Sequence, residues 1–175
     1  MKHSLFISKL LLLCIFISCR PIEDENHHHR ITFYNSIASK LYVVEEINYP
    51  DTTVNHLYVL RQPEIYRVDP YSLNNEAISL HPHDTYEAAF KEYKGYKRIP
   101  SDTLMVFVFD AEKLEKKNPD AKIYFLARYD LSLEDLKHCN WVLTYPPTEA
   151  MKDVKMYPPY ETFAKRDGTG KDSRP

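Results

Sequence analysis

Histidine-rich segments are the first candidates for a metal-binding site in this sequence. Residues 81–84 read His-Pro-His-Asp, and in extended backbone His81 and His83 would project to the same face, as a two-histidine metal site requires. Zinc needs three or four such ligands, and no second compact cluster of His, Asp or Glu supplies the rest. Three histidines at 27–29 lie in a polar stretch with no neighbouring groups to orient their rings. We therefore expect neither a metal ion nor a cofactor.

The sequence gives equally little support for a catalytic cysteine or serine. His138 directly precedes Cys139, and adjacent residues of a helix point about 100° apart, so the imidazole would not face the thiol. The glycines are Gly95, Gly168 and Gly170, too few for the Gly-x-Ser-x-Gly turn of serine hydrolases or for a phosphate-binding loop. We therefore expect a protein that is not an enzyme.

Carboxylates leave one catalytic alternative open. Glu45 and Glu46 are neighbours in a predicted strand and would point to opposite faces of the sheet, so they would not form an acid–base pair. Folding could still bring together two carboxylates that are far apart in the sequence, which is the arrangement that glycoside hydrolysis needs. The alternative function is therefore an extracellular hydrolase that acts on a polymer such as a glycan.

Tyrosine is the most unusual component of the chain. There are 14 tyrosines, and most are expected to pack on sheets with the hydroxyl reaching water. Four are expected in loops or at helix ends, where a rigid amphipathic ring can serve recognition. These candidate ligand-binding residues are Tyr49, Tyr71, Tyr93 and Tyr96. A glycan or a protein of the cell envelope could stack on them.

A basic and aromatic segment occupies residues 91–98, which read Lys-Glu-Tyr-Lys-Gly-Tyr-Lys-Arg. This composition is typical of contacts with single-stranded nucleic acid. The whole chain carries a net charge of −2, whereas nucleic-acid binders concentrate strong positive charge. We expect a solvated loop here and no nucleic-acid partner.

Short strands dominate the secondary structure that must position these residues. They are expected at 31–34, 41–44, 57–60, 65–68, 104–109, 123–129 and 141–145. The run 104–109 is apolar at every position, which is typical of a central strand covered on both faces. Short helices are expected after the N-caps Asp84, Asp110 and Ser132. The predicted fold class is mainly β, a single antiparallel β-sandwich-like domain with two or three short helices in its connections.

The length of 175 residues suits one domain. A polar stretch ending at residue 29 has no periodicity and is predicted to be a flexible tether, and the polar C-terminal residues are predicted to be a disordered tail. We expect a leader at 1–18, the tether at 19–29, the β domain at 30–160 and the tail at 161–175.

The N-terminal residues have the layout of a secretory signal peptide. Two lysines accompany an unbroken apolar run at 10–17, which is too short for a membrane-spanning helix of roughly 20 residues. The run ends in Phe-Ile-Ser-Cys at 16–19, which resembles the lipobox of bacterial lipoproteins. That resemblance implies cleavage after Ser18 and attachment of diacylglycerol and an N-acyl chain such as palmitate to Cys19. Several acyl chains on one residue hold a protein on a membrane essentially permanently.

Further stretches resemble known lipoproteins. The acidic residues 23–25 resemble a surface-export signal of lipoproteins from some gut anaerobes; alternatively, their charges keep a solvated linker extended. Residues 31–35, 48–52, 101–111, 128–136 and 145–147 resemble a family of small lipoproteins of Gram-negative gut bacteria. This second resemblance covers 30–147 and implies a location, with no activity, substrate or catalytic residue.

These features together predict an outer-membrane lipoprotein, held by its lipid anchor and exposed at the cell surface or otherwise facing the periplasm. Its molecular function is predicted to be non-catalytic binding of a glycan or an envelope protein. A purely structural envelope component, which acts through protein contacts alone, is a further alternative.

Overall fold

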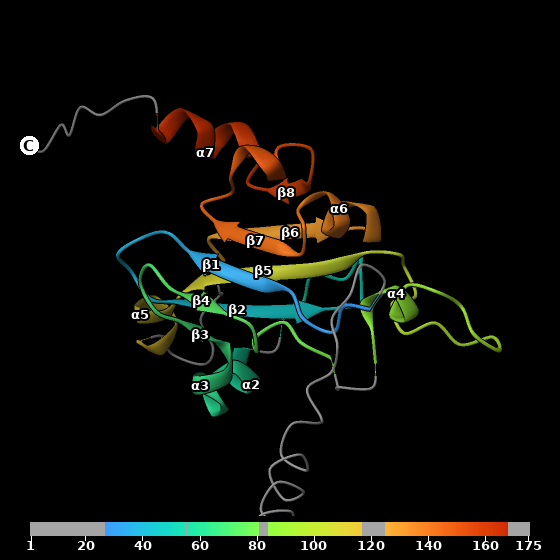
Figure 1. Ribbon diagram of the computed structural model, residues 1–175. Helices are drawn as coiled ribbons and strands as arrows, with labels where there is room; N and C mark the ends of the chain where they lie inside the picture. The colour runs from blue at the N-terminus through green and yellow to red at the C-terminus, as the bar shows by residue number, and fades with distance from the viewer. Residues whose placement is uncertain (1–26, 55, 81–83, 117–124, 168–175) are drawn as a thin grey trace, which may run out of the picture.

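The computed structural model describes residues 27–54, 56–80, 84–116 and 125–167. It confirms the mainly β fold class, with two packed sheets and short helices (Figure 1). The large antiparallel sheet contains, in spatial order, β3 (Arg67–Val68), β2 (Leu41–Glu46), β5 (Leu104–Asp110), β6 (Ala127–Leu131) and β8 (Lys155–Tyr157). The small sheet contains β4 (Leu73–Asn74), β1 (Thr32–Asn35) and β7 (Val142–Tyr145), and it is mixed because β1 and β7 run parallel.

Short helices fill the connections between strands. They are α2 (His56–Arg61), α3 (Pro63–Tyr66), α4 (Tyr86–Ala89), α5 (Ala111–Glu115), α6 (Leu133–His138), the 3₁₀ helix η1 (Glu149–Met151) and α7 (Tyr160–Asp167). The described residues therefore hold more helices than the two or three predicted. Asp110 caps α5 and Ser132 caps α6, as the sequence predicts, and Ser132 forms a complete capping box with Asp135.

Strand β5 is the centre of the domain. It pairs with β2 on one side and β6 on the other, and its apolar residues are buried on both faces, which confirms the prediction for 104–109. Val106 and Val108 face the core between the two sheets, where they join Phe33 of β1. Phe107 faces the outer surface of the large sheet, which α2 and α5 cover. The fold thus has two apolar layers that share one strand.

The structure corrects several local predictions. Residues 57–60 belong to α2 and are not a strand; short apolar runs are ambiguous between the two, and Val59 packs in the layer that covers the outer face of the large sheet. Of the run 65–68, the last two residues form β3, because Pro63 begins a helical turn just before it. The N-cap of α4 is Thr85 and not Asp84: the Thr85 hydroxyl accepts from Ala88 N–H at 3.2 Å.

The folded domain also begins earlier in the chain and ends later than the predicted range of 30–160. His28 and His29 belong to the domain and not to the tether, since His29 is buried and its carbonyl accepts a hydrogen bond from Leu80 N–H at 2.7 Å. Residues 161–167 belong to helix α7 and not to a disordered tail, because Phe163 is buried and packs edge-on against Tyr145. The predicted leader, Cys19 and residues 168–175 lie outside the described residues.

Asn35 at the end of β1 joins the small sheet to strand β3 of the large sheet and to the connection before β2. Its side chain is fully buried, and its amide donates to the carbonyls of Ser39, Val68 and Asp69 at 2.8, 3.2 and 3.1 Å. Its carbonyl accepts from Ile37 N–H at 3.1 Å. All polar atoms of this buried side chain are therefore satisfied within the fold.

We expect Asn35→Ala to lower the free energy of unfolding by about 2–4 kcal/mol, because it leaves several backbone groups without their partner. Urea denaturation measures the change. The control Asn48→Ala, in the exposed turn at 48–51, should change the free energy by less than about 0.5 kcal/mol. An Asn35→Ala variant as stable as the control would show that these hydrogen bonds do not hold the sheets together.

Candidate functional site

Two of the predicted ligand-binding tyrosines meet on one hairpin. Tyr93 and Tyr96 exchange backbone hydrogen bonds of 2.9 and 3.0 Å across a two-residue turn. Lys94 and Gly95 form that turn with φ of 53° and 78°, the backbone of a type I′ turn. Directly opposite residues of a hairpin project to the same face, so both tyrosine side chains belong to one face of the hairpin. They are 70% and 71% exposed.

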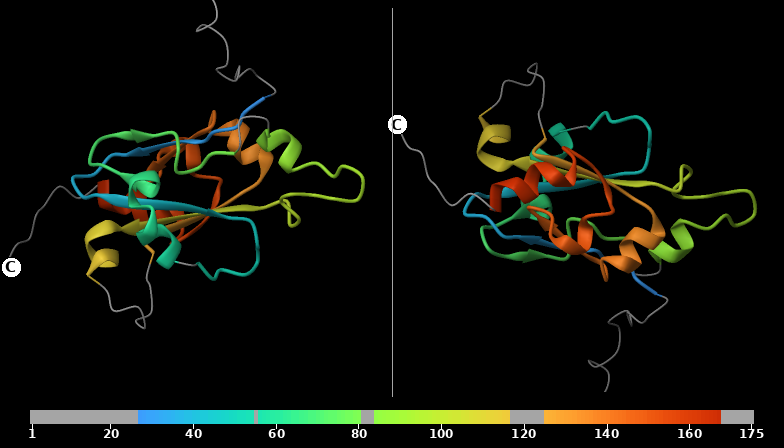
Figure 2. Two further views of the ribbon diagram at one scale, coloured as in Figure 1. Left: turned by 90° about the horizontal axis from the view of Figure 1, so that it is seen from below. Right: turned by 90° about the horizontal axis from the view of Figure 1, so that it is seen from above.

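We call residues 91–98 the tyrosine arm. The arm follows α4 and precedes β5, and both views of Figure 2 show the chain after α4 extending away from the two sheets. Its base is closed where Ile99 N–H donates to the Ala89 carbonyl at 3.0 Å, and the Ile99 side chain is buried in the core. A buried residue thus fixes the root of an exposed hairpin.

A cavity of 340 Å³ lies between the arm and α4. It is lined by Asp84, Thr85, Ala88, Ala89, Lys91, Tyr93, Tyr96 and Arg98. The lining combines two aromatic rings with small apolar side chains and three charged ones. Asp84 and Arg98 form an ion pair of 2.8 Å across the lining. The site is therefore concave, aromatic and polar at once, as small-ligand sites are.

The N-terminal end of the domain holds α4 in place. The His28 backbone N–H and ring Nδ1 lie 3.0 and 2.6 Å from the two carboxylate oxygens of Glu87, and Tyr86 N–H donates to the His28 carbonyl at 2.7 Å. The His28 ring stacks on Trp141 with ring centres 4.1 Å apart. Burial alone would raise the pKa of Glu87, but the hydrogen bonds from His28 outweigh it, so this pKa lies below its ordinary value.

Trp141 can support His28 because helix α6 ends in a Schellman motif. Asn140 N–H donates to the Lys137 carbonyl at 3.0 Å and Trp141 N–H to the Leu136 carbonyl at 2.9 Å. Asn140 and Trp141 both have positive φ, 52° and 60°. Asn tolerates this backbone, but for a residue as large as Trp it is strained, and the close packing of the indole holds it there.

The other two candidate tyrosines do not join this site. Tyr71 is 64% exposed in the turn between β3 and β4. Tyr49 is half-buried, and its hydroxyl accepts from Lys155 Nζ of β8 at 2.7 Å. Of the four candidate tyrosines, Tyr71, Tyr93 and Tyr96 are thus exposed and Tyr49 is half-buried. The sequence could not show that only two of the four share a surface.

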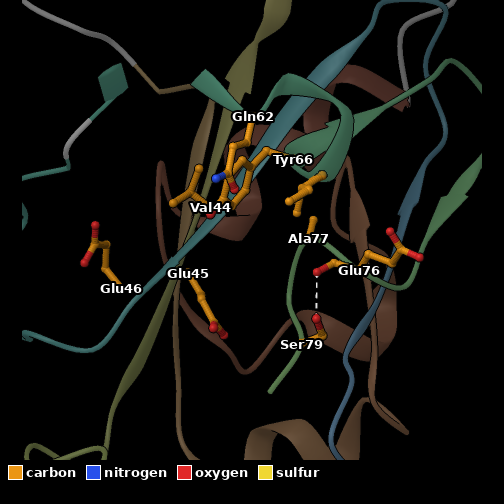
Figure 3. A pocket seen from close by; sticks show the side chains of 9 residues that line it. Val44, Glu45, Glu46, Gln62, Tyr66, Glu76, Ala77 and Ser79 are labelled. Carbon is orange, nitrogen blue, oxygen red and sulfur yellow. Dashed lines mark hydrogen bonds between the residues drawn. The ribbon is translucent and has the colours of Figure 1, made fainter. Parts of the chain in front are cut away.

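A second cavity, of 520 Å³, lies beside strand β2 and contains the most perturbed carboxyl group. Its walls include Glu45 and Glu46 of β2, Gln62 and Tyr66 on one side, and Glu76, Ala77 and Ser79 on the other. Figure 3 shows Glu45 and Glu46 pointing in different directions, as their adjacent positions in a strand predict. A smaller cavity of 180 Å³ shares both glutamates and is also lined by Tyr86 and Arg98.

Glu45 faces the core between the sheets. Its carboxylate accepts a hydrogen bond of 2.8 Å from the Tyr86 hydroxyl. Burial is the main cause that raises the pKa of Glu45 to about 7, while the Tyr86 hydrogen bond and the Arg98 charge lower it. A glutamate that exchanges its proton near neutral pH inside a cavity is a candidate acid or base. No pattern in the sequence predicted this, because Tyr86 is 41 residues away.

The remaining candidates contribute no site. Cys139 is buried, burial raises the pKa of its thiol, and its Sγ lies 3.6 Å from the Ala150 carbonyl. Within the ranges that the structure describes, no three His, Cys, Asp or Glu side chains are grouped so that they could hold a metal ion. His81 and His83 lie outside those ranges, and His28 is occupied by Glu87 and Trp141.

Comparison with known proteins gives no relative: no family model, no curated protein and no solved structure matches this chain. Among the helices described, none has the length and apolar character needed to cross a bilayer.

The raised pKa of Glu45 predicts how stability depends on pH. The folded protein binds this proton more tightly than the unfolded chain does, so the wild type should lose stability as pH rises from about 4.5 to about 7. Relative to Glu45→Gln, the loss should reach about 3 kcal/mol at most. Urea denaturation of both proteins at pH 4.5, 6 and 7.5 measures it. If the free energies of unfolding of the wild type and Glu45→Gln differ by the same amount at all three pH values, Glu45 does not titrate with a raised pKa. The control is Glu92→Gln in the exposed arm, whose difference from the wild type should not depend on pH in this way.

Proposed function

We propose that this protein is a lipid-anchored binding module of the outer membrane that recognises a glycan through the tyrosine arm. The observation that carries the proposal is that Tyr93 and Tyr96, paired on one hairpin, are both exposed and both line a 340 Å³ cavity. Exposed aromatic side chains that gather at one place on a surface mark candidate sites of contact with a partner. Here the tight turn at Lys94 and Gly95 and the buried Ile99 hold the two rings in an exposed position.

A sugar chain suits this site better than an apolar ligand does. The pyranose ring has apolar C–H faces that can lie on the tyrosine rings, and its hydroxyls can bond the polar groups of the lining. Thr85, Asp84 and Arg98 supply those groups within the same cavity. A purely apolar ligand would remove water from the polar side chains of the lining without offering them a hydrogen bond in return, which costs binding energy.

The membrane location rests on the N-terminal sequence. The Phe-Ile-Ser-Cys motif at 16–19 resembles a lipobox, and we propose that Cys19 carries the anchor. The described part of the domain begins at His27, and the next residue, His28, is bonded to α4 beside the arm. The proposed anchor and the proposed recognition site therefore belong to the same end of the domain.

A hydrolase that acts on a glycan is a second candidate function, and Glu45 is the observation that favours it. Its pKa of about 7 suits a proton donor, and it lines two cavities. Incubation with envelope polysaccharide tests it. New reducing ends released by the wild type and not by Glu45→Gln would support hydrolysis, and no release by the wild type would exclude it for that polymer.

We expect the double variant Tyr93→Ala and Tyr96→Ala to bind envelope polysaccharide from the native host at least roughly tenfold more weakly than the wild type. The reason is that the two rings are the largest contact area of the site. Retention of the detergent-solubilised full-length protein on immobilised polysaccharide measures it. Tyr71→Ala, equally exposed but outside the site, should bind as the wild type does. Equal binding by the double variant would refute the arm as the recognition element.

Replacement of Cys19 by Ser should release the protein from the membrane fraction, because the serine side chain has no thiol to receive diacylglycerol and the anchor is lost. Fractionation of host cells and mass spectrometry of the N-terminus measure the effect. The control is Cys139→Ser, at a buried position within the domain, which should leave the protein in the membrane fraction. A wild-type protein with an intact leader would contradict the anchor.

A further inference from the structure

Two lysines of the tyrosine arm have no ion-pair partner among the described residues. Of its four basic residues, Lys97 pairs with Asp102 and Arg98 pairs with Asp84. Lys94 lies over the Tyr93 ring, 5.1 Å from its centre, and has no carboxylate partner among the described residues. Lys91 lines the cavity and likewise has no ion pair in the described part of the chain.

The acidic side chains near the arm do not cancel this charge. Among the described residues that line the cavity, Asp84 is the one carboxylate, and the Arg98 guanidinium already pairs with it at 2.8 Å. Glu92 is exposed and does not line the cavity. The cavity therefore offers an uncompensated ammonium group, that of Lys91, beside two exposed aromatic rings. A ligand that brings a negative charge to this point gains an interaction that a neutral ligand does not.

The position of the proposed anchor places the arm near the membrane surface. Eight residue steps separate Cys19 from His27, so the chain between them spans at most about 28 Å when fully extended. His28 is bonded to Glu87 of α4, and the arm begins four residues after Glu87. The arm therefore belongs to the end of the domain that the proposed anchor restrains.

We infer that the ligand of the tyrosine arm is an acidic sugar chain, in which a pyranose ring stacks on Tyr93 and Tyr96 and a carboxylate or other anionic substituent pairs with Lys91. This inference rests on the proposed function and names its ligand class. The charge discriminates between ligands, while the rings provide contact area that neutral and acidic sugars share.

Two hexasaccharides that differ only in charge test the inference. β-1,4-linked mannohexaose and β-1,4-linked hexamannuronate share ring configuration and linkage, and the second carries a carboxylate at C6 of each residue. We expect the full-length protein in detergent to bind hexamannuronate at least roughly tenfold more tightly in calorimetric titrations at low salt. The difference should shrink as salt rises, because salt screens exposed charges.

Lys91→Gln identifies the group responsible. It should weaken hexamannuronate binding by roughly three- to tenfold and mannohexaose binding by much less, because only hexamannuronate carries a carboxylate for the lysine to pair with. Lys113→Gln, an exposed lysine on α5 at the other end of the domain (Figure 1), should change neither. Both positions are exposed, so thermal unfolding should be unaltered and a folding defect can be recognised.

Three outcomes would overturn the inference. Equal affinity for the two hexasaccharides, or no binding of either, would show that acidic sugars are not the ligand class. Binding to phosphatidylglycerol vesicles that depends on Lys91, without saccharide binding, would assign the arm to the lipid surface. The proposed function is judged separately by the retention of the Tyr93 and Tyr96 double variant on envelope polysaccharide, so either claim can fail alone.

Discussion

The arrangement of the candidate site depends on how one helical turn, α4, is held against the sheets. Four residues of helix are not stable by themselves, because one turn forms too few hydrogen bonds to offset the ordering of its backbone. Contacts from three distant parts of the chain supply the missing stability. His28 binds Glu87, the Tyr86 hydroxyl binds Glu45 of β2, and Ile99 N–H binds the Ala89 carbonyl. Because the tyrosine arm follows α4 directly, these contacts also fix the position of the arm.

The two candidate chemistries of the molecule meet at the same helix. Tyr86 donates to Glu45 on the core side, while Thr85 and Ala88 line the cavity below the arm on the outer side. Thr85, which lines the cavity beside the arm, is therefore adjacent in the chain to Tyr86, the hydrogen-bond partner of Glu45. Partial burial of the Glu45 carboxylate lowers the free energy of unfolding when the group is charged. Such a loss of stability is typical of positions that serve catalysis or binding.

Much of the scaffold could be predicted from the sequence, because the signals were local. Apolar residues at every position of 104–109 indicated a two-sided central strand, and the caps Asp110 and Ser132 marked helix starts. The prediction failed where distant contacts decide the structure. Val59 is helical because it covers the outer face of the large sheet, and Phe163 is ordered because it packs against Tyr145.

The candidate site shows the same division. Exposure of Tyr93 and Tyr96 followed from loop signals around Gly95, but their pairing on one hairpin required a turn with two positive φ angles, one of them at Lys94. The roles of Glu45 and His28 had no sequence signal, since each is defined by a partner at least 41 residues away.

The most direct test of the recognition claim is hydrogen–deuterium exchange of the full-length protein with and without envelope polysaccharide. The account predicts slower exchange confined to α4 and the tyrosine arm, residues 84–99. Protection around the cavity of Glu45, at residues 62–79, or no protection anywhere, would contradict it.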